Sequence, residues 1–408
     1  MKKNLSISKN FYWISGIVII SVLVSCKKYD SLGFTPGKGA PAISSVHTWG
    51  KTDTTARYDT VITYDASGNI IKTLHQLPSQ VNPFDSVTTA GKLGNFYIIY
   101  GSNLGSTSSI TFNGYSAYFN RALITDNSII VQVPSKTPYF GAQATDSLII
   151  TTLYGKAYYK FSILPPPPTV TGYSNYNFST GSRITLTGVG FATVTSVTLS
   201  GTSSGTANVT IVNQNDSVLV VQFPATTIAR GTLGFGYTAA GSPQTATATQ
   251  ELVDLDNAYQ IFTDDFQNAW GDGSWQSPSG KSTNQAKSGT ASFMGTFTAN
   301  GWKIEGFSNW WPSLPYDNSY KYFSFWVKGG TVNHTLNIET NTSALGYGQN
   351  DGNPIVVPAN VWTYFKIPIS SISFWSSGST LQQVGFFLKG QGGDVDETYY
   401  FDDVILIK

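Results

Sequence analysis

Side chains that could carry out acid–base or covalent chemistry are scarce in this sequence. The chain has three histidines and no Gly-x-Ser-x-Gly elbow beside a helix, so a Ser-His-Asp site is not indicated. A glycosidase needs two carboxylates placed across the scissile bond. Residues 256–408 contain only three glutamates, Glu305, Glu339 and Glu397, and their aspartates crowd the first and last segments. The residues therefore favour a binding protein over an enzyme.

Tryptophan gives the strongest functional signal. Eight of the ten tryptophans follow Asp256, and one small domain cannot bury that many indoles without leaving some in solvent. Residues 256–408 have no Arg, eight Lys and 13 Asp plus Glu, a net charge of −5 that disfavours nucleic acid or another polyanion. Exposed indoles beside amides and hydroxyls suit a neutral sugar, because its C–H face stacks on the ring and its hydroxyls bond the polar groups. The region is thus expected to bind carbohydrate.

Two loop-like segments hold the indoles that are hardest to bury. Gly, Ser and Pro exclude a regular core strand from residues 270–276 and 307–313. We expect a stacking platform centred on Trp275, Trp310 and Trp311. The further rings expected to contribute are Trp270, Trp302, Tyr347 and Trp375. The side chains expected to bond sugar hydroxyls, chosen by proximity in sequence, are Asn309, Gln276, Glu305 and Asn350.

Strand alternation assigns some of the remaining aromatic residues. In residues 322–328, Phe323, Phe325 and Val327 share one face, and Trp326 lies on the other. Trp326 is therefore either a core residue or a ligand contact, and Trp362 is expected in the core. Tyrosines of the middle region, Tyr115, Tyr118, Tyr158 and Tyr159, are expected in the core or at interfaces, with a secondary glycan contact as the alternative.

The only cysteine, Cys26, can form neither a disulfide nor a Cys-based zinc site within one chain. It follows a basic start and a short apolar run, and Leu23-Val24-Ser25-Cys26 resembles the lipobox of bacterial lipoproteins. We expect residues 1–25 to be a signal peptide, Cys26 to carry the lipid, and residues 26–40 to be a tether to the outer membrane, facing the cell exterior. An uncleaved membrane helix is the alternative, although the apolar stretch is short for a span.

Many short strands are expected before residue 256, since Gly, Thr, Ser and aromatic residues abound and no helical apolar period is sustained. Residues 94–105 resemble 181–191, and residues 125–134 resemble 214–224, with a spacing of about 90 residues in both cases. The copies resemble IPT/TIG domains, which are immunoglobulin-like sandwiches. The expected domains are 41–164, with extra strands in 52–92, and 165–255. The four prolines at 165–168 are expected to act as a stiff spacer.

Residues 256–408 resemble jelly-roll carbohydrate-binding modules of the galactose-binding-like fold. The resemblance lies in residues 259–266 and 399–406, which would be paired first and last strands, and in the strands around Trp326 and Trp362. The predicted fold is all-β, with tandem IPT/TIG-like sandwiches followed by this jelly roll. The resemblance also implies a structural Ca²⁺ held by Asp265 with Asp402 or Asp403, with exposed turn acids as the alternative. No other cofactor is expected.

The order of lipoprotein cysteine, tandem IPT/TIG-like sandwiches and Trp-rich jelly roll resembles surface glycan-binding proteins of bacterial polysaccharide-utilisation systems. That resemblance implies non-catalytic capture of a neutral polysaccharide, xyloglucan or a related β-glucan, for delivery to a neighbouring outer-membrane transporter. The low net charge of +1 speaks against a nucleic-acid partner. The alternatives are an adhesin whose aromatic domain binds protein, since Trp and Tyr also dominate protein hot spots, and, less favoured, a glycoside hydrolase.

Overall fold

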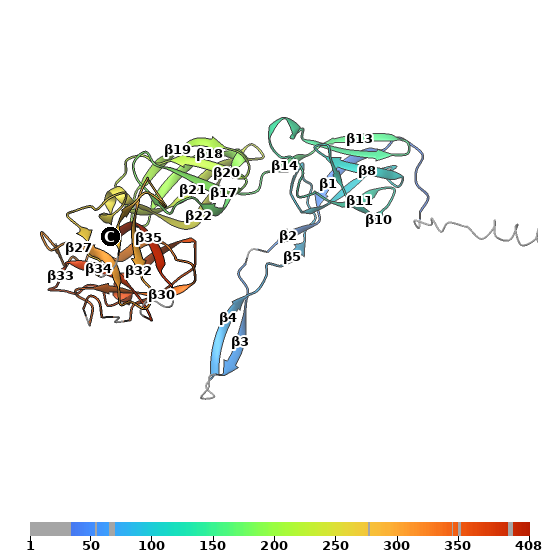
Figure 1. The fold of residues 1–408 in the computed structure, drawn as a ribbon. Coiled ribbons are helices and arrows are strands. Elements are labelled where there is room, and N and C mark those ends of the chain that lie inside the picture. The colour runs from blue at the N-terminus through green and yellow to red at the C-terminus, as the bar shows by residue number, and fades with distance from the viewer. Residues whose placement is uncertain are drawn as a thin grey trace, which may run out of the picture. The chain divides into compact units, whose positions relative to one another are not determined.

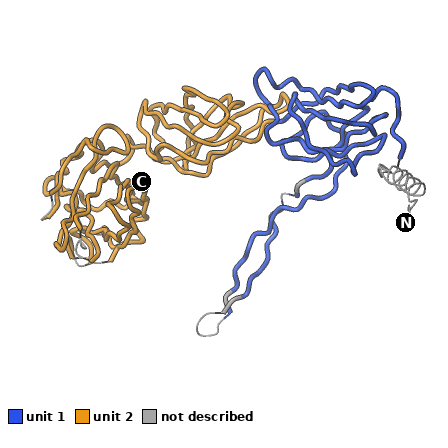
Figure 2. Tube along the Cα trace, turned by 45° about the vertical axis from the view of Figure 1, so that its right-hand side comes forward, with its two compact units in different colours: residues 1–164 blue, residues 165–408 orange. Residues whose placement is uncertain are grey.

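The computed structural model describes residues 34–53, 55–64, 70–275, 278–344, 346–349, 352–390 and 395–408. The chain divides into two compact units, Met1–Leu164 and Pro165–Lys408 (Figure 2). Strands dominate both units (Figure 1), which confirms the all-β prediction. Helix in the described ranges is limited to four short 3-10 turns, η1 (Gly141–Gln143), η2 (Phe191–Thr193), η3 (Leu255–Asn257) and η4 (Ile369–Ser371). Within those ranges, no helix has the length and apolar character needed to span a bilayer.

The first unit contains a sandwich of two four-stranded sheets around one core. One sheet consists, in order, of β1 (Ala42–Thr48), β7 (Phe96–Ser102), β11 (Ser128–Gln132) and β10 (Phe119–Ile124). The other consists of β13 (Gly155–Lys160), β12 (Ser147–Thr152), β8 (Thr107–Phe112) and β9 (Tyr115–Ala117). Alternating residues of both sheets, such as Ile99 and Ile150, are fully buried between them.

The segment between β1 and β7 forms a two-stranded ribbon outside the sandwich sheets (Figure 1). β2 (Gly50–Thr52) pairs with β5 (Val81–Pro83), and β3 (Tyr58–Tyr64) pairs with β4 (Ile70–Gln76). β6 (Ala90–Lys92) then pairs in parallel with β14 (Ser162–Leu164). The extra strands expected here are therefore present, although they do not extend the sandwich sheets.

The second sandwich is one eight-stranded sheet that folds over its own core. The strands in order are β15 (Thr169–Tyr173), β17 (Arg183–Val189), β20 (Val218–Gln222), β19 (Thr206–Gln214), β18 (Val194–Gly201), β21 (Arg230–Ala239), β22 (Ser242–Asp254) and β16 (Asn177–Phe178). β19 pairs with β18 through its first half and with β20 through its second half. This strand therefore joins the two layers, whose core includes Leu186, Leu219 and Leu233.

The sequence repeat corresponds to the same strand pair in both sandwiches. β7 pairs with β11 in the first, and β17 pairs with β20 in the second. The glycines before β7 and β17, Gly94 and Gly181, have φ angles of 78° and 79°, a left-handed conformation that favours glycine. Their N–H groups donate to the carbonyls of Val133 and Phe223, which follow the partner strands. The two copies thus share a backbone turn as well as a pattern.

The third sandwich packs a six-stranded sheet on a five-stranded sheet. The first sheet has β25 (Ser279–Ser282), β26 (Ser292–Phe297), β35 (Glu397–Ile407), β29 (Tyr322–Lys328) and β32 (Trp362–Pro368) in order, and β23 (Tyr259–Phe262) also pairs with β35. The second has β24 (Gly271–Asp272), β27 (Ile304–Ser308), β34 (Gln383–Leu388), β30 (His334–Thr340) and β31 (Pro354–Val357). β28 (Leu314–Pro315) pairs with β33 (Thr380–Leu381). The pairing of β23 with β35 confirms the expected contact of first and last strands.

Alternation along β29 and β35 decides which face each side chain occupies. Phe323, Phe325 and Val327 enter the core between the two sheets, as expected. Trp326 faces the second sandwich instead, where its Nε1–H donates to Asn175 Oδ1 at 2.9 Å and its ring stacks on Tyr176 with centroids 5.3 Å apart. Trp326 is therefore neither part of the core between the two sheets nor a ligand contact, because it lies at the contact between the second and third sandwiches.

The rest of this contact is apolar and ionic. Val253 of the second sandwich is buried with Ile405 and Ile407 of the third. Glu251 Oε1 accepts from Lys366 Nζ across the contact. The second sandwich therefore contacts the outer face of the six-stranded sheet at β29, β32 and β35, and both sandwiches belong to one compact unit.

Candidate functional site: an aromatic face on the third sandwich

The outer face of the five-stranded sheet of the third sandwich carries a cluster of aromatic side chains. Along β27, Phe307 points into the core, whereas Ile304 belongs to a separate outer cluster with Trp302, Tyr347 and Phe387. This outer cluster supports the indole of Trp275.

Trp275 is attached to the start of β27 by two backbone hydrogen bonds. Its N–H donates to the Ile304 carbonyl at 2.9 Å, and the Ile304 N–H donates back at 3.3 Å. The Trp275 ring lies 6.1 Å from the Trp302 ring at an interplanar angle of 36°, and it meets the edge of Tyr347 at 5.0 Å. Trp275 is 39% exposed, while Trp302 is half-buried against Phe387. We call Trp275 and Trp302 together an aromatic station; the indole of Trp275 faces solvent.

Tyr347 supports this station from below. Only 6% of the residue is exposed, and its hydroxyl donates to the Gly273 carbonyl at 2.9 Å. The hydroxyl lies over Gly306 of β27 and Gly385 of β34, where added Cβ atoms would be 2.3 and 2.7 Å from it. Burial, followed by the charge of Glu339, raises the pKa of Tyr347 well above its usual value. Tyr347 therefore positions Trp275, and its expected role as a stacking ring is wrong.

Glu339 holds the loop that carries Tyr347, and sequence reasoning missed it. This fully buried carboxylate accepts the N–H groups of Gly348 at 2.6 Å and Gln349 at 3.1 Å. Gly348 packs directly on the indoles of Trp275 and Trp302. The signal was available in β30, where Leu336 and Ile338 alternate with Asn337 and Glu339, which places the polar pair on the outer face.

Trp310 and Trp311 form a second station, at the other end of β27. They are 62% and 85% exposed, so the solvent exposure expected of both, and of Trp275, is confirmed. Asn309 anchors their loop: its N–H donates to the Gln382 carbonyl, its Nδ2 donates to the Asn268 carbonyl at 3.1 Å, and its Oδ1 accepts the Ser313 N–H at 3.0 Å. Asn309 is 1% exposed, so it is a support for the loop and its expected contact with sugar hydroxyls is wrong.

The two stations are separated by the length of β27. β27 has five residues between the Trp275 contact and the Trp310 loop, which corresponds to about 17 Å of extended chain. The outward positions of the strand are 304, 306 and 308, and Trp310 is the next residue of the same parity. A surface with indoles at both ends is long enough for several units of a polymer.

Three other expected ligand residues are buried within the sandwich. Trp270 is 4% exposed, and its Nε1–H donates to the Tyr259 hydroxyl at 3.2 Å. Trp375 is 8% exposed and stacks on Tyr320. Glu305 is fully buried between the two sheets, against Gly295 of β26, because it has the parity of Phe307. Their assignment to the platform is wrong.

Four sequence predictions lie outside the described residues: the signal peptide of residues 1–25, Cys26 as the lipid attachment site, and Gln276 and Asn350 as hydroxyl partners. Trp362, expected in the core, is half-buried at the start of β32.

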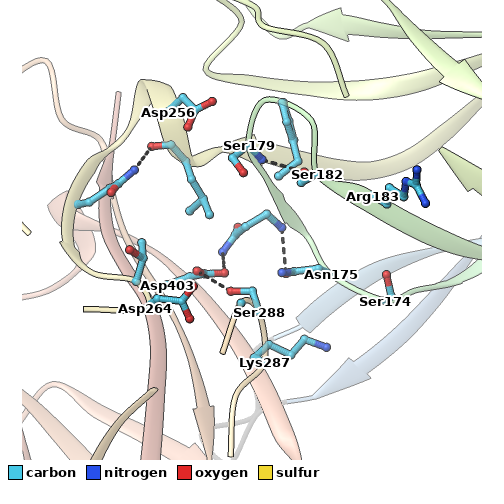
Figure 3. Close-up of a pocket in the computed structure, with 16 residues that line it drawn as sticks. Ser174, Asn175, Ser179, Ser182, Arg183, Asp256, Asp264, Lys287, Ser288 and Asp403 are labelled. Atoms are coloured by element: carbon cyan, nitrogen blue, oxygen red, sulfur yellow. Dashed lines mark hydrogen bonds between the residues drawn. The ribbon is translucent and has the colours of Figure 1, made fainter. Parts of the chain in front are cut away.

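A cavity of about 510 Å³, lined mostly by polar residues, lies between the second and third sandwiches. Figure 3 shows Asp264, Asp403, Ser288 and Lys287 gathered at one end of it and Arg183 at the other. Asp403 is fully buried and accepts from Asn177 Nδ2 at 3.1 Å and Ser288 Oγ at 2.8 Å. The hydrogen bond from Asn177 connects the two sandwiches.

The carboxylates expected to hold calcium are placed differently from one another. Asp265 is exposed and pairs with Lys281 at 2.8 Å, which with a backbone hydrogen bond lowers its pKa. Asp402 is fully buried, and its Oδ2 accepts the N–H groups of Lys287 and Ser288. No three His, Cys, Asp or Glu side chains are close enough to hold a metal ion within the described ranges. A structural Ca²⁺ held by Asp265 with Asp402 or Asp403 therefore stays a prediction.

Comparisons with known proteins give similarities of two kinds, and no family model matches the chain. An IPT/TIG domain-containing protein of Bacteroides ovatus is 32% identical over 119 residues, which are 28% of this chain and 24% of that protein. This chain therefore matches about a quarter of the length of that relative.

Among solved structures, the surface glycan-binding protein PbSGBP-B of Prevotella bryantii is 16% identical, covers 91% of this chain and 99% of its own, and has a TM-score of 0.48. SGBP-B from a complex xyloglucan utilisation locus of Bacteroides uniformis is 13% identical over 90% and 99% of the two chains, with a TM-score of 0.37. A family 11 carbohydrate-binding module of Clostridium thermocellum is 17% identical over 37% of this chain and 94% of its own, with a TM-score of 0.26. The chain is thus similar to an IPT/TIG domain-containing protein in sequence and to surface glycan-binding proteins in the solved structures it matches.

Proposed function

We propose that this chain is a non-catalytic binding protein for a neutral polysaccharide. The observation that carries the proposal is the placement of exposed indoles at both ends of β27: Trp275 beside its first residue and Trp310 and Trp311 just after its last. Each indole offers an apolar face to a pyranose ring, and the separation of the stations suits a chain of several sugars. Xyloglucan or a related β-glucan is the favoured ligand, on the sequence resemblance described above.

The positions of the buried glutamates favour binding over hydrolysis. Glu305 lies between the two sheets, while Glu339 lies on the outer face and is bonded to the loop that carries Tyr347. Because the two carboxylates occupy opposite faces of one sheet, they cannot act on the same glycosidic bond. Lipidation at Cys26, a place on the outer membrane facing the cell exterior, and delivery to a neighbouring transporter complete the proposal.

Affinity gel electrophoresis of the chain without residues 1–26 tests the proposal. The gels contain xyloglucan, mixed-linkage β-glucan, mannan, xylan or starch. We expect retardation by one neutral glycan. Trp310→Ala/Trp311→Ala should lose about tenfold or more in affinity, since aromatic rings that the bound ligand covers contribute much of the binding energy. Trp275→Ala should weaken binding in the same gel.

The control is Phe140→Ala in the first unit, because Phe140 is 43% exposed, close to the 39% of Trp275. This variant should migrate like the unsubstituted chain. If retardation persists in all Trp variants, these Trp residues do not form the binding site. If none of the glycans retards the chain, binding of a protein to the aromatic face becomes the favoured function.

A further inference from the structure

A second group of exposed rings lies in the first unit, at the base of the ribbon. Trp49 is the only indole among the described residues between 34 and 269, and it is 48% exposed. Trp49, Phe84 and Val81 line a cavity of about 540 Å³, which is within the usual size range of small-molecule sites. We call this cavity the Trp49 groove; its remaining walls are Thr48, Asn82, Pro83, Asp85 and Ile98.

The walls of the Trp49 groove are held by backbone pairing. The Trp49 N–H donates to the Phe96 carbonyl at 3.3 Å, and the Phe84 N–H donates to the Trp49 carbonyl at 3.4 Å. Thr48 Oγ1 donates to the Phe84 carbonyl at 2.7 Å. The two ring-bearing residues are therefore fixed in space although their side chains are exposed, and binding between them would cost little ordering of the backbone.

Charge around the groove is sparse and balanced. Asp85 Oδ1 lies 2.6 Å from His47 Nδ1, and 65% of the Asp85 side chain is exposed. Lys51 Nζ lies 5.6 Å above the Phe84 ring. One carboxylate and one ammonium beside two aromatic rings and the amide of Asn82 suit a neutral ligand with both apolar faces and hydroxyl groups.

We propose that the Trp49 groove is a second binding site for a neutral glycan, in which one or a few sugar units stack on Trp49 and Phe84. This inference rests on the proposed function. A polysaccharide repeats the same unit along its length, so one polymer can engage two sites of one chain and bind more tightly than either site alone. A stable protein interface uses about 20–30 residues on each side, which is more than the eight residues of the groove.

The test counts ligands on the chain without residues 1–26. Isothermal titration calorimetry uses an oligosaccharide made from the glycan that retards the chain most strongly. Four proteins are compared: the unsubstituted chain, Trp49→Ala/Phe84→Ala, Trp310→Ala/Trp311→Ala, and the combination of both pairs. We expect two, one, one and no bound oligosaccharides. In the gel with the intact polysaccharide, Trp49→Ala/Phe84→Ala should lose about tenfold in affinity.

The matched control is Phe140→Ala/Tyr154→Ala, two rings of the first unit that are each 43% exposed. This variant should keep both sites, and thermal unfolding checks that every variant is folded. If the unsubstituted chain and Trp49→Ala/Phe84→Ala bind the same number of oligosaccharides, the inference is overturned and the proposed function is left intact. Complete loss in Trp49→Ala/Phe84→Ala, with no effect of Trp310→Ala/Trp311→Ala, supports the groove and contradicts the third-sandwich platform. If the unsubstituted chain binds no glycan, both the proposed function and the inference about the Trp49 groove are contradicted.

Discussion

Asp402 and Asp403 are neighbouring acids that are completely buried in the folded chain. Burial, followed by the charge of Asp403, raises the pKa of Asp402 from 3.8 to about 8. The folded chain therefore keeps a proton that the unfolded chain loses near pH 3.8. The stability that this proton contributes is fully present below pH 3.8 and is lost as the pH rises toward 8. The free energy of unfolding should fall over this range by up to about 1.4 kcal/mol per pH unit.

The substitution Asp402→Asn tests this dependence, since Asn cannot ionise and still offers one oxygen to the N–H groups of Lys287 and Ser288. Urea unfolding followed by Trp fluorescence at pH 5, 6.5 and 8 should give a flatter profile than that of the unsubstituted chain. Asp265→Asn is the control, because this carboxylate is exposed and its pKa is lowered by Lys281. Parallel profiles for Asp402→Asn and the unsubstituted chain would exclude Asp402 as the source.

Local composition predicts the exposure of some indoles and not of others. Pro, Ser and Asn around Trp310 and Trp311 exclude a core strand, and both rings are exposed. The same reasoning is wrong for Trp270 and Trp375, since Tyr259 and Tyr320 come from other segments and cover them. Whether a loop side chain is buried depends on which residues from other segments pack over it, and the sequence of the loop does not specify those residues.

At the scale of elements, Gly306 of β27 and Gly385 of β34 leave the space that the Tyr347 hydroxyl occupies, and Tyr347 in turn positions the exposed indole of Trp275. An added Cβ at Gly306 would meet the Tyr347 hydroxyl at 2.3 Å and the Val384 carbonyl at 2.5 Å. We expect Gly306→Ala to destabilise the sandwich by about 1–3 kcal/mol and to weaken glycan binding by displacing Trp275. Gly271→Ala in the neighbouring strand β24 is the control, because nothing lies within 4 Å of its added Cβ. Thermal unfolding and affinity gels measure both effects, and equal melting of the two variants would contradict the coupling.

Strand pairing could be predicted wherever the signal is local. The repeat of glycine, alternating strand and turn identified β7 with β17 and β11 with β20 correctly, because each copy needs the same left-handed glycine before its strand. The parity of β29 correctly separated Phe323 from Trp326. β3 and β4 were expected only as extra strands of the first sandwich. Alternation in the sequence predicts that a strand forms, but it does not reveal which strands it pairs with, so the separate ribbon could not be predicted.

At the scale of the whole molecule, the second sandwich is more than a spacer. Its segment Asn175-Tyr176-Asn177 bonds Trp326, Tyr364 and Asp403 of the third sandwich. Nothing in the local pattern of these three residues distinguishes them from an ordinary turn, so sequence reasoning assigned residues 256–408 as an independent module. The available signal was Trp326 itself, an indole on the strand face opposite the core.

Residues 256–408 should consequently be less stable alone than as part of residues 165–408. Removing the second sandwich exposes Trp326, Ile405 and Ile407, whose burial contributes roughly 5 kcal/mol together. It also leaves the buried carboxyl of Asp403 without the amide of Asn177. Calorimetry of the two fragments should show one shared transition for 165–408, and a midpoint lower by roughly 10 °C or more, or insoluble protein, for 256–408. Residues 165–255, prepared alone, show whether their own transition also moves. If both short fragments melted where 165–408 does, the contact would be too weak to make the two sandwiches one folding unit, and the glycan platform would depend on the third sandwich alone.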